Sequence, residues 1–120
     1  MSNVANMQSI EHTFATHGQS PVYLSIASRD SAIKQTTIHW KNRLISQPNF
    51  IHVPIGTTSD DYTSERLKCE TITSAIGPRS NHVSIEYELT AGEHSEKYIF
   101  EQPLDTTRRT VNIEIVFTFV

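Results

Sequence analysis

Two clusters of basic residues are the groups in this sequence best suited to bind a ligand. One is Lys41 with Arg43, next to Trp40, and the other is Arg108 with Arg109. In an extended strand, alternation places Lys41 and Arg43 on one face and Trp40 on the other. Basic side chains near an aromatic ring can hold phosphates and stack on bases. These five residues are candidate contacts for nucleic acid or an acidic partner. The alternative is a solvated sheet face whose charges pair with glutamates of a neighbouring strand.

The histidines do not form a recognisable metal-binding pattern. His12 and His17 are five residues apart, and His82 and His94 flank a predicted hairpin. A zinc site needs three or four ligands in tetrahedral geometry, usually with a characteristic spacing. Glycine-rich nucleotide-binding patterns are also missing from the sequence. We therefore expect neither a metal nor a cofactor.

A catalytic nucleophile is equally hard to find. The sequence has no G-x-S-x-G elbow, and Cys69 is its only cysteine, so no disulfide can form within the chain. We expect Cys69 to act as a small buried hydrophobic residue. Glu86 and Glu88 share one face of a predicted strand, as alternating glutamates in any strand would. The sequence thus predicts a protein that is not an enzyme.

The closing stretch RRTVNIEIVFTFV, residues 108–120, is the most hydrophobic strand of the chain. Ile113, Ile115, Phe117 and Phe119 alternate along one side of it. Left exposed, they would form a patch of the size that marks an interaction site. An unprotected sheet edge also invites pairing with another chain. We predict that these four residues lie in the centre of the chain's own sheet or at a subunit boundary, and that the protein self-associates.

Seven stretches have the alternation or the β-rich composition of strands. They are residues 21–28, 32–46 (one long strand or a hairpin), 50–55, 67–76, 82–89, 96–102 and 110–120. Turn signals separate them every 8–14 residues. This spacing predicts an all-β fold, a single antiparallel β-sandwich or barrel of about seven strands.

The first 19 residues allow two interpretations. Val4, Met7, Ile10 and Phe14 recur at spacings of three, three and four, which would form one face of a short helix. An extended arm fits them equally well. We accordingly divide the chain into an N-terminal arm or short helix, residues 1–19, packed on a β-sandwich domain, residues 20–120.

Composition limits the classes of protein that the chain can belong to. Its 120 residues suit one domain, and 13 serines and 14 threonines favour strands and turns. The net charge of −3 argues against a dedicated nucleic-acid binder. The N-terminus lacks the basic start and apolar run of a signal peptide, and no stretch is long enough for a membrane span. We expect a cytoplasmic protein or a component of a virion or other particle.

The stretch YIFEQPLDTT, residues 98–107, resembles the small aegerolysin-type β-sandwiches. The similarity covers about forty residues, without the aromatic and glycine residues that this family has around the proline. It implies a β-sandwich that binds membrane lipids.

Two functions follow from these observations. The first is a non-enzymatic structural subunit that assembles with itself, like a phage or viral coat, tail or appendage protein. The second is a small binding module for a glycan, a lipid membrane or a protein partner, like a lectin, an aegerolysin or an immunity protein. The sequence does not separate them, nor does it identify a ligand.

Overall fold

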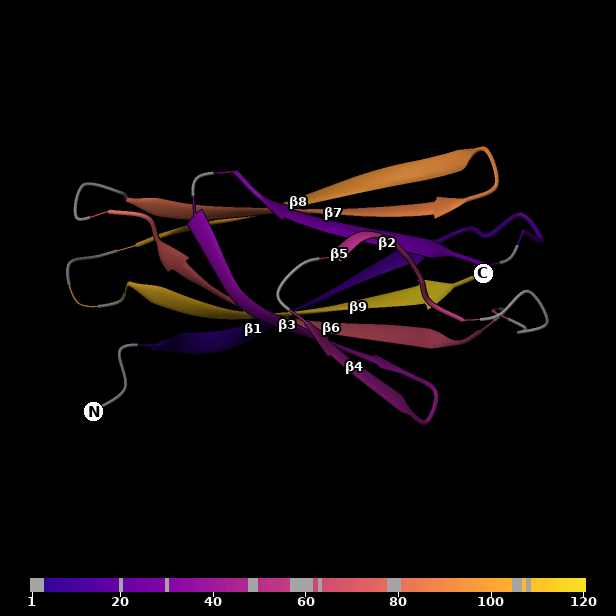
Figure 1. Ribbon diagram of the computed structural model, residues 1–120, viewed down its shortest axis with the longest axis horizontal. Coiled ribbons are helices and arrows are strands. Elements are labelled where there is room, and N and C mark those ends of the chain that lie inside the picture. The colour runs from indigo at the N-terminus through magenta and orange to yellow at the C-terminus, as the bar shows by residue number, and fades with distance from the viewer. Residues whose placement is uncertain are drawn as a thin grey trace.

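The chain folds into two β-sheets packed face to face (Figure 1). The computed structural model describes residues 4–19, 21–29, 31–47, 50–56, 62, 64–77, 81–104, 107 and 109–120. Its nine strands are β1 (Val4–Phe14), β2 (Tyr23–Ser28), β3 (Ser31–Trp40), β4 (Arg43–Gln47), β5 (Phe50–Pro54), β6 (Arg66–Ala75), β7 (His82–Ala91), β8 (His94–Pro103) and β9 (Thr110–Phe119). The all-β prediction is confirmed, and the two sheets do not close into a barrel. The predicted number of about seven strands is wrong.

Two features of the sequence account for the two extra strands. A two-residue turn at Lys41 and Asn42 divides the stretch 32–46 into β3 and β4. The N-terminal segment forms β1, so of the short helix and the extended arm that the sequence allows, the helix is wrong, and no helix occurs among the described residues. Where its side chains are described, burial in β1 alternates along the strand. Ile10 and Phe14, whose spacing of four suggested a helix, both lie on the more buried side of this strand.

The first sheet contains the strands in the order β1-β9-β6-β3-β4, and the second in the order β5-β2-β7-β8. All neighbours are antiparallel except β1 and β9, which pair in parallel with Ile10 opposite Ile115 and Phe14 opposite Phe119. The sandwich is therefore mixed rather than purely antiparallel. The parallel pair joins the first strand of the chain to the last.

The hydrophobic core fills the space between the two sheets. Alternate residues of the strands point inward, as for Ile38 in β3, Leu67 in β6 and Tyr87 in β7, all of which are buried. The end of β9 is fixed by its own chain, because the Val120 N–H donates to the Phe14 carbonyl over 3.0 Å. The C-terminal strand thus lies inside the first sheet, between β1 and β6.

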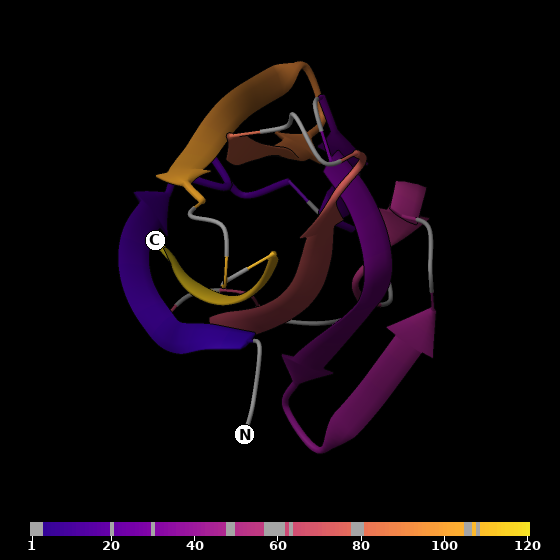
Figure 2. The same ribbon diagram turned by 90° about the vertical axis from the view of Figure 1, so that its left-hand side faces the viewer.

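The two sides of the sandwich differ. On one side, β1 and β8 lie close together, and the Tyr98 hydroxyl donates to the Thr13 carbonyl over 3.3 Å (Figure 2). The His12 and Tyr98 rings are 4.5 Å apart in the same region. On the other side, the β3–β4 hairpin extends away from the second sheet (Figure 2). Strand β4 therefore has one side exposed at the edge of its sheet.

Candidate functional site

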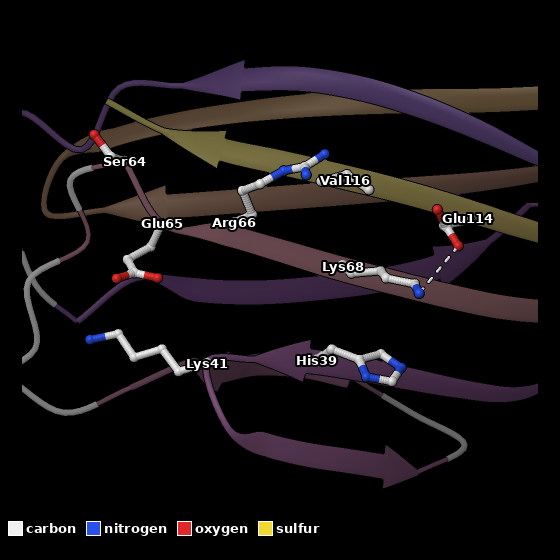
Figure 3. Close-up of a pocket in the computed structure, with 8 residues that line it drawn as sticks. All are labelled: His39, Lys41, Ser64, Glu65, Arg66, Lys68, Glu114 and Val116. Atoms are coloured by element: carbon white, nitrogen blue, oxygen red, sulfur yellow. Dashed lines mark ion pairs between the residues drawn. The ribbon is translucent and has the colours of Figure 1, made fainter.

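A cleft lies on the outer face of the first sheet. Its volume is about 530 Å³, within the usual range for small-molecule sites. Figure 3 shows the side chains around it, which come from three strands and two turns and are all polar except Val116. They are His39 and Lys41, then Ser64, Glu65, Arg66 and Lys68, and finally Glu114 with Val116.

The register of the sheet explains why these residues lie together. Lys68 of β6 is opposite His39 of β3 on one side and Val116 of β9 on the other. Directly opposed residues in neighbouring strands point to the same face, so the three side chains form a row across the outer surface. Glu70 and Glu114 are opposed in the adjacent row. Three strands distant in sequence thus present their charges to one surface.

Lys68 links the two glutamates of this surface. Its ammonium Nζ lies 3.2 Å from Glu70 Oε1 and 3.5 Å from Glu114 Oε2. Like charges directly opposite each other in a sheet are destabilising, and a lysine between them removes that repulsion. The hydrogen bond to Glu70, followed by the charges of Glu114 and Glu70, raises the pKa of Lys68. The lysine stays charged at every physiological pH.

Further pairs hold other parts of the surrounding surface. The Arg66 guanidinium is 2.6 Å from Glu11 Oε1, and the Ser9 hydroxyl donates to Glu114 Oε1 over 3.0 Å. The His39 Nε2 is 3.9 Å from Glu70 Oε1. Arg66, Lys68 and His39 thus each lie beside a carboxylate.

Two residues of the cleft have a backbone conformation that glycine favours. Lys41 has φ 54° and Ser64 has φ 66°. For residues other than Gly, Asn and Asp this left-handed conformation costs roughly 1–2 kcal/mol. Strained residues often cluster at functional sites, where the surrounding structure maintains them. Both lie toward one end of the cleft in Figure 3, on the same side as Glu65.

The structure separates the basic residues that the sequence analysis grouped. Lys41 lies in the cleft and Arg43 begins β4, both at one end of the first sheet. Arg109 lies at the other end, where its guanidinium donates to the Gly77 carbonyl over 2.6 Å. The eight residues of β6 between these ends span roughly 27 Å. Arg108 lies outside the described residues.

Trp40 is a core residue and not a surface ring. Its side chain is 1% exposed, stacks on Tyr62 at a centroid distance of 5.0 Å and contacts the edge of Phe119. A base cannot reach a ring in this position. The nucleic-acid hypothesis therefore lacks the stacking partner on which it depended.

The four residues predicted for self-association lie in the core. Ile113, Ile115, Phe117 and Phe119 are all at most 1% exposed, and β9 has a neighbouring strand on each side. This strand was predicted to lie either in the centre of its own sheet or at a subunit boundary, and it lies inside its own sheet. A surface for self-association has to be sought elsewhere in the molecule.

The histidines outside the cleft also do not converge. His82 begins β7 and pairs at the level of Pro103, whereas His94 begins β8 opposite Ala91, so they lie at opposite ends of the hairpin. His17 and His94 do approach, with ring centroids 4.6 Å apart. Among the described residues, no group of three or more His, Cys, Asp or Glu side chains could hold a metal ion.

Sequence reasoning missed most of the cleft. Arg66, Lys68 and Glu70 alternate along β6, and Glu114 interrupts the apolar pattern of β9. This alternation of charge was the available signal. The pairing of β6 with β9, which brings the charges together, could not be derived from the sequence.

A second surface of interest is the outer edge of β4. Trp40 and Arg43 close a two-residue hairpin, and the pair that closes such a turn exchanges both hydrogen bonds. Because bonded and non-bonded pairs alternate, the backbone N–H and C=O groups of Leu44 and Ser46 point away from β3. Leu44 is also 63% exposed. Strand β4 thus presents unpaired backbone groups and an apolar side chain.

Comparison of the chain with protein-family models, curated proteins and solved structures gives no match. The described residues also contain no helix long and apolar enough to cross a membrane. Arguments about function therefore depend on the two surfaces described above.

Proposed function

We propose that the protein is a non-enzymatic structural subunit that self-associates through the outer edge of β4. The observation that carries this proposal is the self-complementary pattern of the strand. Leu44 and Ser46 direct their backbone groups outward, with Ile45 between them. In an antiparallel two-fold pair centred on Ile45, Leu44 of each copy faces Ser46 of the other. The outward groups of both residues then form four reciprocal hydrogen bonds.

Side chains also suit this pairing. Ile45 faces its own copy in the non-bonded pair, where side chains approach most closely, and it already packs partly against the core. No charged residue of β4 faces its own copy, because Arg43 would lie opposite Gln47. The result is a ten-stranded sheet formed from two five-stranded ones.

Other edges carry features that oppose pairing. Strand β5 ends with Pro54 and contains His52 with φ 49°, which distorts the strand. Strand β8 ends with Pro103 and lies next to β1 through Tyr98. Prolines and irregular backbone are common means of protecting sheet edges. Within the described part of the chain, β4 has none of these features.

The native mass of the protein tests the proposal. We expect a concentration-dependent dimer with a dissociation constant in the micromolar range or weaker, because one short strand pair is a small interface. The variant Leu44→Pro removes an outward N–H and should be monomeric, whereas Leu44→Thr keeps the N–H and should still dimerise. A wild-type chain that stays monomeric at millimolar concentration in sedimentation would overturn the proposal.

A larger particle, such as a coat, tail or appendage, requires a second contact because a two-fold pair is closed. Ile51 and Ile99 in the second sheet are 82% and 52% exposed and could contribute to it. Masses above that of a dimer, persisting in Leu44→Pro, would indicate such a contact.

The cleft favours a second candidate, a small binding module. It combines a suitable volume, side chains held by ion pairs and two left-handed residues at one end. These features are independent of the β4 edge.

A further inference from the structure

We infer that the cleft on the outer face of the first sheet binds an uncharged, hydroxyl-rich ligand of the saccharide class. This inference rests on the binding-module candidate and does not depend on a β4 dimer. It follows from the balance of charge in the cleft, from the pairing of its side chains and from the single apolar residue on its floor.

Charges of both signs lie in and beside the cleft, so an ion of either sign would meet repulsion as well as attraction. Its cationic side chains are Lys41, Arg66 and Lys68, and its carboxylates are Glu65 and Glu114, with Glu11 and Glu70 at its border. Three positive charges therefore meet four negative ones. An anion would have to approach these carboxylates, and a cation would have to approach the basic groups.

The ion pairs of the cleft can act on hydroxyl groups without separating. A hydroxyl donates one hydrogen bond and accepts others, so it can bridge the Lys68 ammonium and the Glu114 carboxylate. These two groups are 3.5 Å apart. Hydrogen bonds in which one partner is charged are stronger than neutral ones. Vicinal hydroxyls of a saccharide match this alternation of donors and acceptors.

The apolar groups that line the cleft can contact the C–H face of a sugar ring. Val116 is 5% exposed and lies beneath the cleft beside Lys68, its partner across the strands. The methylene groups of Lys68 and Arg66 supply further apolar contact. Among the described residues that line the cleft, none is Phe, Tyr or Trp, and the imidazole of His39 is the one aromatic ring. We therefore expect weak binding, with dissociation constants in the millimolar range.

Backbone amide shifts in nuclear magnetic resonance titrations test this inference. The neutral probes are maltose, lactose and diacetylchitobiose, and the charged probes are glucuronate, glucose 6-phosphate and glucosamine, each at tens of millimolar. We expect a neutral probe to shift the amides of β6 and β9 around Lys68 and Glu114. The variant Glu114→Gln should weaken this binding at least tenfold, whereas Glu101→Gln, on an exposed part of β8, should not change it.

Each other result has a definite meaning. If only the charged probes shift the amides of the cleft, the inference that the ligand is uncharged is overturned, and the binding-module candidate is retained. If none of the six probes shifts these amides, both the saccharide inference and the binding-module candidate are overturned. Equal binding by Glu114→Gln and wild type would place the ligand outside the cleft and would also overturn the inference. If Glu114→Gln fails to fold, Arg66→Gln, with Lys97→Gln as its control, replaces it.

Discussion

Ser64 has a backbone conformation that few serines adopt. Its φ is 66°, and its N–H donates to the Phe119 carbonyl over 2.8 Å, which holds the turn against the end of β9. The same turn brings Glu65 and Arg66 to the cleft. The strain at Ser64 is therefore part of how the fold builds one end of the cleft. Glycine would adopt this conformation without a steric cost.

The substitution Ser64→Gly should stabilise the protein by about 0.5–1 kcal/mol. Relief of the left-handed strain is partly offset by the greater entropy of a glycine in the unfolded chain. Ser64→Ala is the matched control, because alanine loses the same hydroxyl but keeps the strain. Urea unfolding of the three proteins measures the difference. An increase of the same size in Ser64→Ala would mean that the hydroxyl, not the backbone, is responsible.

At the scale of strands, the sequence predicts local pattern better than pairing. Strands β2, β5 and β9 fall within stretches that alternation or composition identifies, and β6, β7 and β8 overlap such stretches and extend one or two residues beyond them. Strand β1 is missed because Val4, Met7, Ile10 and Phe14 fit a helical spacing as well as a strand. The sequence leaves the stretch 32–46 open as one long strand or a hairpin, because its turn at Lys41 lacks the glycine that two-residue hairpins usually contain. Local rules fail where tertiary pairing decides the conformation.

The same limit applies to the candidate site. Basic residues next to an aromatic ring suggested a ligand surface at Trp40, but the alternation of β3 turns that ring into the core. Of the proposed residues that the structure describes, which are Trp40, Lys41, Arg43 and Arg109, Lys41 alone lies in the cleft. Most of the other side chains that line the cleft belong to β6 and β9. These two strands are adjacent in the sheet and about forty residues apart in the chain.

Strand β1 is required to cover β9. Deleting residues 1–14 would leave one side of β9 unpaired and would uncover core residues such as Phe117 and Phe119. We expect the truncated chain to aggregate or to lose its cooperative thermal transition, because open apolar edges pair with other chains. Deletion of residues 1–3, which keeps all of β1, is the control. A truncated chain that unfolds cooperatively near the wild-type temperature would show that β1 is dispensable.

In the whole molecule, the first strand and the last strand of the chain lie side by side (Figure 1). The Thr16 N–H donates to the Val120 carbonyl over 3.0 Å, and β1 pairs with β9 along its length. The first sheet is complete only when the first and last strands have joined. Folds dominated by such non-local pairing reach the native state slowly, in milliseconds to seconds. They also unfold as one unit, because no sheet can open without exposing the shared core.

Cys69 can report on this global unfolding. It lies in β6, the central strand of the first sheet, opposite Ile38 on one side and Ile115 on the other, and its side chain is fully buried. Burial raises the pKa of the Cys69 thiol, so the thiol remains protonated in the native state. A thiol reagent needs both access and the thiolate. We therefore predict that labelling of Cys69 occurs only through complete unfolding.

The free energy of opening obtained from Cys69 labelling should equal that from urea unfolding, and its denaturant dependence should match the global slope.

The labelling should also depend on pH. Since the pKa of the Cys69 thiol is higher in the native state than in the unfolded state, the unfolded state binds fewer protons above about pH 8.5, the usual pKa of cysteine. The contribution of the Cys69 thiol to the free energy of unfolding is therefore fully present below that pH and is lost as the pH rises. Labelling of Cys69 then also becomes more frequent. Ser46→Cys combined with Cys69→Ala places a thiol on exposed β4 and should react at once. Labelling of Cys69 that is independent of urea would instead reveal local separation of β6 from a neighbouring strand, and cooperative unfolding of the sandwich would be refuted.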